Sequence, residues 1–137
     1  MTTLVLDSEA VSQLARSRAG VDSARVHAAL RAADLAGSDV LVPAAVLAEQ
    51  YRGGGHDQMV DACLGRNSGI DVVDTTRALA RDVGHLLARA GRGSEDHVDA
   101  VVVATAVAAG GGVIMTSDVD DLAGLAAATT GVVIEPV

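Results

Sequence analysis

The sequence predicts an α/β protein in three layers, with a mainly parallel central sheet of four or five strands and helices on both faces. The first observation is that short apolar runs of β type alternate with longer helical segments along all 137 residues. The second is that half of the residues are apolar although Tyr51 is the only aromatic one, so the core must be built from Ala, Val, Leu and Ile. The third is the length, which suits one domain over residues 1–137, with no internal repeat or linker.

The first half of the chain is expected to hold two strands and four helices. In order, the elements are a strand over 3–6, helices over 8–15 and 21–36, a strand over 40–42, a helix from 43 to the glycines at 53–55, and a helix over 57–64. Asp7-Ser8 forms a turn and helix cap directly after the first strand. Pro43 lies in a first helical turn, where proline is tolerated because its nitrogen needs no hydrogen bond there.

The second half of the chain continues the alternation and ends on a strand. In order, the elements are a strand over 70–73, helices over 75–90 and from 94 to about 109, a strand over 112–115, a helix over 119–128, and a strand over 132–134. Ser94-Glu95-Asp96 is typical of a helix start, because it combines a capping serine with acids in the first turn. The valines of 98–103 would suit a strand, but the cap before them and the alanines after them favour a helix.

The charge balance excludes several classes of protein. Ten cations face 18 carboxylates, which gives a net charge of −8, and every cation is an arginine. Without lysine the chain cannot form a Schiff base or a phosphate-binding loop that ends in Gly-Lys-Ser/Thr. An acidic chain of this kind is a poor non-specific binder of nucleic acid, although metal ions can reverse the local sign of the charge.

The predicted location is the cytoplasm. No apolar run reaches the roughly 18 residues of a membrane span, and the N-terminus lacks the basic start and long apolar stretch of a signal peptide. The lone Cys63 cannot form an internal disulfide, and no Cys/His spacing is typical of a zinc site. We therefore expect a protein of a reducing compartment with no membrane partner.

Two aspartates directly follow strands. Asp7 comes after the first strand, and Asp118 comes after the strand over 112–115 and the residues Thr116-Ser117. Because sites in parallel sheets lie beyond the carboxyl ends of the strands, these two side chains are expected to lie close together. The alternative is that each aspartate only caps the helix that follows it.

Two further acids lie in apolar helical segments. Glu49 and Asp99 each have mostly alanine, valine and leucine neighbours, so both carboxylates are expected to be buried and to need a partner. Arg52, three residues after Glu49, is one candidate partner. Asp99 has only acids, Glu95 and Asp96, at the preceding helical positions.

The simplest joint solution places Asp7, Glu49, Asp99 and Asp118 around divalent cations. Two carboxylates about 5 Å apart repel by roughly 3 kcal/mol at an effective dielectric constant of about 20, so the cluster needs cations or protonation. Oxygen ligands indicate Mg²⁺, with Mn²⁺ as a substitute. The candidates for an additional acid or a hydrogen-bonding partner are Asp96, Asp120, Asp121, Ser8, Thr116 and Ser117. The candidates for contact with phosphate, or alternatively for a solvated face, are Arg52, Arg89 and Arg92.

These motifs together resemble a PIN domain, and more closely the VapC-type toxins of bacterial toxin–antitoxin pairs. The resemblance covers nearly the whole chain and rests on strand-Asp7-Ser8, Pro43-x5-Glu49, Asp99-Ala100-x3-Ala104-Thr105-Ala106 and Thr116-Ser117-Asp118-Val119-Asp120-Asp121-Leu122. It implies a PIN-like fold and a Mg²⁺-dependent endoribonuclease, commonly a homodimer, that a cognate antitoxin inhibits. By position Asp7, Glu49, Asp99 and Asp118 correspond to the family's four acids, and Asp120 or Asp121 corresponds to a less regular fifth.

The mechanistic hypothesis is metal-assisted hydrolysis of an RNA phosphodiester. A cation held mainly by Asp7, Asp99 and Asp118 would activate a water, and a second near Glu49 would stabilise the leaving oxygen. The alternative is a catalytically inactive PIN-like module that serves protein interaction. Receiver domains and haloacid-dehalogenase-like phosphatases also place acids at strand ends, but as families they rely on a lysine, which this chain lacks.

Overall fold

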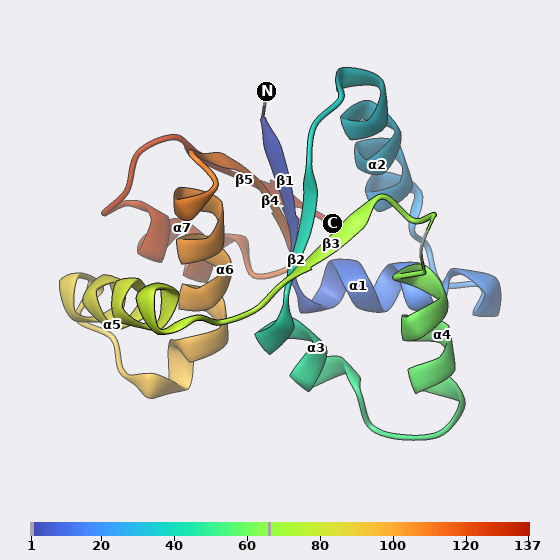
Figure 1. The fold of residues 1–137 in the computed structure, drawn as a ribbon, viewed down its shortest axis with the longest axis horizontal. Coiled ribbons are helices and arrows are strands. Elements are labelled where there is room, and N and C mark those ends of the chain that lie inside the picture. The colour runs from blue at the N-terminus through green and yellow to red at the C-terminus, as the bar shows by residue number, and fades with distance from the viewer. Residues whose placement is uncertain (1, 66) are drawn as a thin grey trace.

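A five-stranded sheet in which every pairing is parallel forms the centre of the molecule. The computed structural model describes residues 2–65 and 67–137. The strands are β1 (Thr3–Leu6), β2 (Val40–Pro43), β3 (Ile70–Val73), β4 (Gly112–Thr116) and β5 (Val132–Pro136). Their order, β3-β2-β1-β4-β5, places β1 in the middle with β2 and β4 beside it (Figure 1). The predicted parallel sheet is confirmed.

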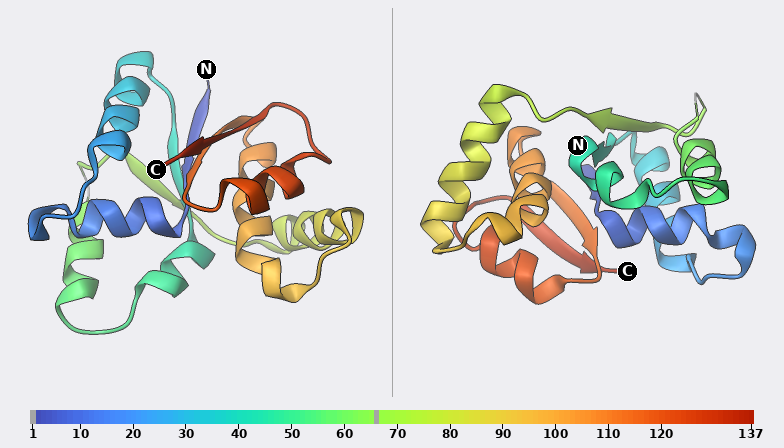
Figure 2. Two further views of the ribbon diagram at one scale, coloured as in Figure 1. Left: turned by 180° about the vertical axis from the view of Figure 1, so that it is seen from behind. Right: turned by 90° about the horizontal axis from the view of Figure 1, so that it is seen from below.

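Helices cover both faces of this sheet. They are α1 (Ser8–Ala15), α2 (Ala24–Ala36), α3 (Ala44–Gln50), α4 (Gly55–Cys63), α5 (Arg77–Ala90), α6 (His97–Ala108) and α7 (Val119–Ala126), with 3₁₀ turns at Ser17–Ala19 and Ser94–Asp96. The helices α5, α6 and α7 lie on one side of the sheet, and α1, α2 and α4 lie on the other (Figure 1). The views from behind and from below show the same two helical layers (Figure 2). The predicted three-layer architecture is therefore confirmed. No helix within these described residues is both long and apolar enough to cross a membrane.

The core is aliphatic, as the composition predicts. The central strand β1 is buried along its whole length, and α6 is buried without interruption from Ala100 to Ala106. This helix contacts β1, β2, β4 and β5 as well as its neighbouring helices, so apolar residues cover all of its sides. The valines of 98–103 thus belong to a buried helix, which confirms the expectation for the most ambiguous segment.

The register of the central strands brings separate parts of the sequence together at one edge. Leu6 of β1 pairs with Met115 of β4, and the backbone N–H of Asp7 donates to the carbonyl oxygen of Met115 at 3.2 Å. The carboxyl ends of β1 and β4 therefore lie side by side. Asp7 and Asp118, which follow these strands, lie at the same edge of the sheet. Figure 1 shows this end of the sheet at the bottom, where α1 and α3 begin.

Several helix boundaries differ from those expected. The second helix begins at Ala24 and not at 21, because a 3₁₀ turn and Gly20, with φ of 87°, redirect the chain first. The helix that was expected to reach the glycines at 53–55 ends at Gln50. There the N–H groups of Arg52 and Gly53 donate to Asp57 Oδ1 at 2.9 and 3.0 Å. This side-chain acceptor draws the chain into a loop, and α4 begins directly after it at Gly55.

Candidate active site

An acidic hollow lies at the carboxyl ends of β1 and β4, between the starts of α1 and α6 and the helix α3. Its volume is about 370 Å³, and we call it the acid pocket, lined by Asp7, Ser8, Glu9, Glu49, Glu95, Val98, Asp99, Val102, Ser117 and Asp118. The four acids predicted from the sequence meet here, and Glu9 and Glu95 join them. Within the described residues every charged side chain that lines the acid pocket is a carboxylate.

Asp7 is the most buried of these acids, with 7% of its surface exposed. Its Oδ1 accepts a hydrogen bond from the N–H of Ala10 at 3.0 Å, which caps α1. Burial raises the pKa of Asp7 above its ordinary value, although hydrogen bonds from the Thr116 hydroxyl and the Ala10 N–H oppose the rise, and the charge of Asp118 adds to it. Asp7 therefore caps a helix and also lines the acid pocket, so capping is not its only place in the structure.

Asp99 is half-buried in the first turn of α6 and shows the effect of its acidic neighbours most clearly. Burial, followed by the negative charges of Asp118, Asp121, Asp96 and Asp7, raises the pKa of Asp99 to about 6. No basic residue of the described part of the chain contributes to this shift. Among those residues Asp99 therefore lacks a cationic partner, as the spacing around it predicted.

The segment after β4 supplies one acid and two hydroxyls. Asp118 is exposed and occupies the N-cap position of α7, but its side chain makes no capping hydrogen bond. Its backbone N–H donates instead to the Thr116 hydroxyl at 2.9 Å. Thr116 is fully buried and supports Asp7 on its other side, whereas Ser117 is exposed at the rim of the acid pocket. Of the two hydroxyls, Thr116 is the one that lies against a predicted metal-binding acid.

Glu49 is exposed, whereas the sequence predicted that it would be buried. The short helix α3 turns Val46, Leu47 and Gln50 towards the core, which leaves Glu49 on the solvent side. The apolar neighbours that suggested burial are largely alanines, and these residues tolerate exposure. Nor does Arg52 serve as its partner, since the guanidinium donates to the backbone carbonyls of Ala48 and Tyr51 at 2.8 and 2.7 Å.

Gln50 is a residue of this region that sequence reasoning missed. Its side chain is buried, and Nε2 donates to the carbonyl oxygen and the hydroxyl of Ser8 at 2.9 and 2.6 Å. His56 Nε2 lies 3.4 Å from Gln50 Oε1. The Ser8 hydroxyl, which was expected to support a carboxylate, therefore accepts a hydrogen bond from Gln50. No local pattern marks this contact, because 42 residues separate its two partners.

The remaining candidates lie around the acid pocket rather than in its lining. Asp121 and Asp96 act on Asp99 through their charge, whereas Asp120 is exposed and is not among the charges that shift its pKa. Arg89 is exposed in the last turn of α5. Arg92 is partly covered and makes the only ion pair among the described residues, between Nη1 and Asp96 Oδ2 at 4.0 Å.

The donor set of the acid pocket fits a hard divalent cation. Its ligand atoms are carboxylate and hydroxyl oxygens, which Mg²⁺ and Mn²⁺ prefer. Across residues 2–65 and 67–137 no three carboxylate, imidazole or thiol groups are gathered closely enough to bind one ion by themselves. Mg²⁺ in phosphate-processing sites is commonly held by one or two carboxylates and keeps several waters, so the arrangement suits that ion.

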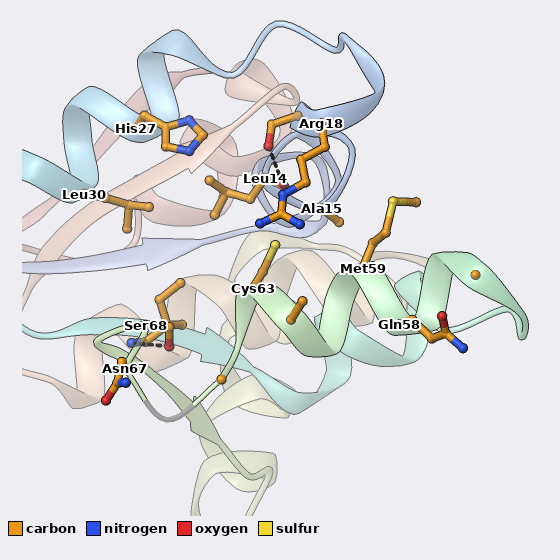
Figure 3. A pocket seen from close by; sticks show the side chains of 15 residues that line it. Leu14, Ala15, Arg18, His27, Leu30, Gln58, Met59, Cys63, Asn67 and Ser68 are labelled. Atoms are coloured by element: carbon orange, nitrogen blue, oxygen red, sulfur yellow. Dashed lines mark hydrogen bonds between the residues drawn. The ribbon is translucent and has the colours of Figure 1, made fainter.

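A second, larger cleft has a different character. It has a volume of about 710 Å³, lies between the end of α1, α2 and α4, and shares no lining residue with the acid pocket (Figure 3). Arg18, His27, Met59 and Cys63 contribute side chains to it, and no carboxylate lines it within the described part of the chain. Burial raises the pKa of the Cys63 thiol, and the charge of Arg18 opposes the rise. This thiol is half-buried.

The fold and the acid pocket together define a parallel α/β protein whose strand ends carry a carboxylate cluster. The family follows from the sequence: the model of the PIN domain family matches residues 4–127, so the chain belongs to that family. The sequence-based resemblance to a PIN domain is thereby confirmed.

The fold is also similar to that of a chain in the crystal structure of VapBC2 from Rickettsia felis bound to a DNA fragment from their promoter. The TM-score is 0.70 at 14% sequence identity, and the match covers 99% of this chain and 99% of that chain. This likeness is one of fold. No curated protein sequence matches the chain.

Proposed function

We propose that the protein is a Mg²⁺-dependent endoribonuclease that hydrolyses RNA phosphodiesters and acts as the toxin of a toxin–antitoxin pair. The observation that carries the proposal is the acid pocket, where Asp7, Glu49, Asp99 and Asp118 meet and which no arginine or histidine of the described residues lines. The raised pKa of Asp99, about 6, supports it further, because like charges that persist at neutral pH favour a bound divalent ion. Membership of the PIN domain family is consistent with nuclease chemistry.

In this proposal each acid has a role that follows from its position. Asp7, which accepts hydrogen bonds from the Ala10 N–H and the Thr116 hydroxyl, would hold the ion from the buried side. Asp99 on α6 and Asp118 after β4 would be the further protein ligands, and waters would fill the remaining positions on the ion. Glu49, which is exposed on α3 and lines the pocket, would act on the solvent side, where a phosphodiester can approach. When bound, the metal would lower the pKa of a water and neutralise charge on the phosphoryl group. The chain itself contributes orientation and charge, and no side-chain nucleophile is needed.

The RNA substrate is proposed on the same grounds. Among the described residues the only charged side chains that line the pocket are carboxylates, and these repel a phosphodiester until cations occupy the pocket, so substrate binding should depend on the metal. With a net charge of −8 the chain has little general affinity for nucleic acid, and it must bind the backbone through a few placed arginines. Arg52 and Arg89 are exposed and are the better candidates for this contact.

The proposed partners are a cognate antitoxin and a second copy of the chain, and the proposed location is the cytoplasm. The structure with the similar fold is a VapBC2 complex bound to promoter DNA, which supports an antitoxin partner for this chain. Size-exclusion chromatography with light scattering of the purified chain would test the homodimer. Co-expression with the product of the adjacent gene would test the antitoxin.

A catalytically inactive PIN-like interaction module is the second candidate. It is favoured by the spread of the acids, because within the parts of the chain that are described no three of them stand ready to bind one ion. In that case the carboxylates would not bind Mg²⁺ or Mn²⁺ at millimolar concentration, with or without RNA.

The deciding experiment is a calorimetric titration of the purified protein with Mn²⁺ and Mg²⁺, followed by incubation of each loaded sample with a mixed RNA pool. Asp99→Asn removes one proposed ligand, and Asp34→Asn, at an exposed position on α2, is the matched control. Saturable binding and RNA cleavage that Asp99→Asn loses and Asp34→Asn keeps would support the proposal. Absence of both binding and cleavage in the unmodified protein would favour the interaction module.

A further inference from the structure

Arg92 connects two segments that carry acids of the site. It lies in the turn between α5 and the 3₁₀ turn Ser94–Asp96, which leads into α6. Its Nη1 donates to the backbone carbonyl oxygen of Asp121, in the first turn of α7, at 3.0 Å. The same Nη1 lies 4.0 Å from Asp96 Oδ2, and only 24% of the arginine side chain is exposed. The guanidinium therefore bridges the start of α6 and the start of α7, and the arginine side chain as a whole is partly buried.

A glycine on α7 makes room for this bridge. A Cβ atom built at Gly124 would overlap Arg92 Nη2, so the guanidinium occupies the space that any side chain at this position would fill. Gly124 lies inside the helix Val119–Ala126, where glycine is less favourable than alanine. Its backbone does not adopt the left-handed conformation that would require glycine. The glycine thus leaves room for the guanidinium in the position it occupies, and a side chain here would displace it.

The two bridged segments also contain the charges that surround Asp99. Asp96 precedes α6, and Asp118 and Asp121 lie at the start of α7, so both bridged segments carry carboxylates. Carboxylates that repel one another favour separation of the two segments. A guanidinium with several donors in one plane opposes that separation, because it binds the carbonyl of one segment and the carboxylate of the other.

We propose that Arg92 is a positioning residue, which holds the first turn of α7 against the start of α6 and so sets the spacing of Asp99 and Asp118 for a divalent cation. The proposal rests on the proposed function of the acid pocket. It assigns Arg92 a different role from contact with RNA phosphate, because its guanidinium is engaged with Asp121 and Asp96 within the protein. Arg92 acts through the acids and touches neither metal nor substrate.

Two variants test the position of the Arg92 guanidinium separately from its charge and from the stability of the fold. Arg92→Ala removes the bridge, whereas Gly124→Ala leaves the charge in place and displaces only the flexible end of the arginine. The second change should not lower the unfolding temperature, because alanine favours the helix. Arg81→Ala, at an exposed position on α5, is the matched control.

The measurement is the affinity for Mn²⁺ by calorimetry without RNA, together with the unfolding temperature of each metal-free variant. Removal of residues that orient metal ligands typically weakens metal affinity about 10- to 100-fold. We expect a loss of about tenfold for both Arg92→Ala and Gly124→Ala, and no change for Arg81→Ala. A loss in Gly124→Ala at an unchanged unfolding temperature would identify positioning and not a general loss of fold.

The outcomes distinguish this inference from the proposed function. If the unmodified protein binds Mn²⁺ and Asp99→Asn does not, but both bridge variants bind normally, the positioning role is wrong and the metal site stands. If Arg92→Ala raises only the KM for RNA at unchanged Mn²⁺ affinity, Arg92 contacts substrate and the inference is overturned. If the unmodified protein binds no Mn²⁺, the metal site and the positioning role fail together.

Discussion

The side-chain amide of Gln50 donates two hydrogen bonds to Ser8, one to the backbone carbonyl oxygen at 2.9 Å and one to the hydroxyl at 2.6 Å. This contact ties the end of α3, next to Glu49, to the start of α1, next to Asp7. Glu49 and Asp7 are distant in the sequence, but their uncharged neighbours Gln50 and Ser8 are joined by these hydrogen bonds.

Replacement of Gln50 by alanine should destabilise the protein by about 1 kcal/mol, because the partly buried carbonyl oxygen and hydroxyl of Ser8 lose their hydrogen bonds. Urea denaturation of the metal-free protein measures this change. Gln58→Ala, at an exposed position on α4, is the control and should stay within about 0.5 kcal/mol of the unmodified protein. Equal stability of the two variants would show that the bonds to Ser8 contribute nothing measurable.

Two replacements of Asp7 separate the effect of its capping hydrogen bond from the effect of its charge. Asparagine accepts the hydrogen bond from the Ala10 N–H as well as aspartate does, whereas alanine loses it, which costs about 0.5–2 kcal/mol. We expect both Asp7→Asn and Asp7→Ala to abolish RNA cleavage. Thermal unfolding without metal should show Asp7→Asn at least as stable as the unmodified protein and Asp7→Ala less stable. Cleavage activity in Asp7→Asn would remove this acid from the metal site.

Asp99 should make the metal-free protein less stable as the pH rises. Its pKa of about 6 lies above the ordinary value of 3.8, so the folded state binds the proton more tightly than the unfolded state does. The resulting stabilisation is present below about pH 4 and is lost as the pH rises through 6. One pKa unit corresponds to about 1.4 kcal/mol, and the solvent around a half-buried carboxyl reduces the effect, so we expect about 1 kcal/mol.

The measurement for Asp99 is the free energy of unfolding of the unmodified protein and of Asp99→Asn between pH 4 and 7.5, with a chelator present. The variant should be the more stable of the two at neutral pH, and the difference should shrink towards pH 4. A variant that is less stable at neutral pH would mean that Asp99 has a structural partner. Addition of Mn²⁺ should reverse the order, because only the unmodified protein gains stability from the bound ion.

Glu49 is exposed, so its replacement should affect chemistry and leave the fold intact. We expect Glu49→Gln to change the free energy of unfolding by less than about 0.5 kcal/mol, as surface substitutions do. RNA cleavage should fall strongly, while Mn²⁺ binding at the buried side of the acid pocket persists. Glu9→Gln provides a comparison, since Glu9 also lines the pocket but was not predicted to act. Equal cleavage by both variants would remove Glu49 from the proposed mechanism.

The succession of strands and helices, the parallel sheet and the four acids could be predicted from the sequence because each depends on local patterns. Apolar periodicity indicates the elements, and the carboxyl ends of parallel strands necessarily share one edge of the sheet. Asp7 and Asp118 follow from this geometry alone. The assignment of catalytic and metal-binding roles to these acids stays a prediction.

The contacts that organise the pocket were decided by the tertiary structure. Gln50 meets Ser8 across 42 residues, and Arg92 meets Asp121 across 29, at positions that no periodicity marks. The exposure of Glu49 likewise depends on how the short helix α3 rotates against the core, which alanine neighbours leave open. Local residue patterns determine which elements form, whereas the partners of individual polar side chains depend on the packing of elements that are distant in the chain.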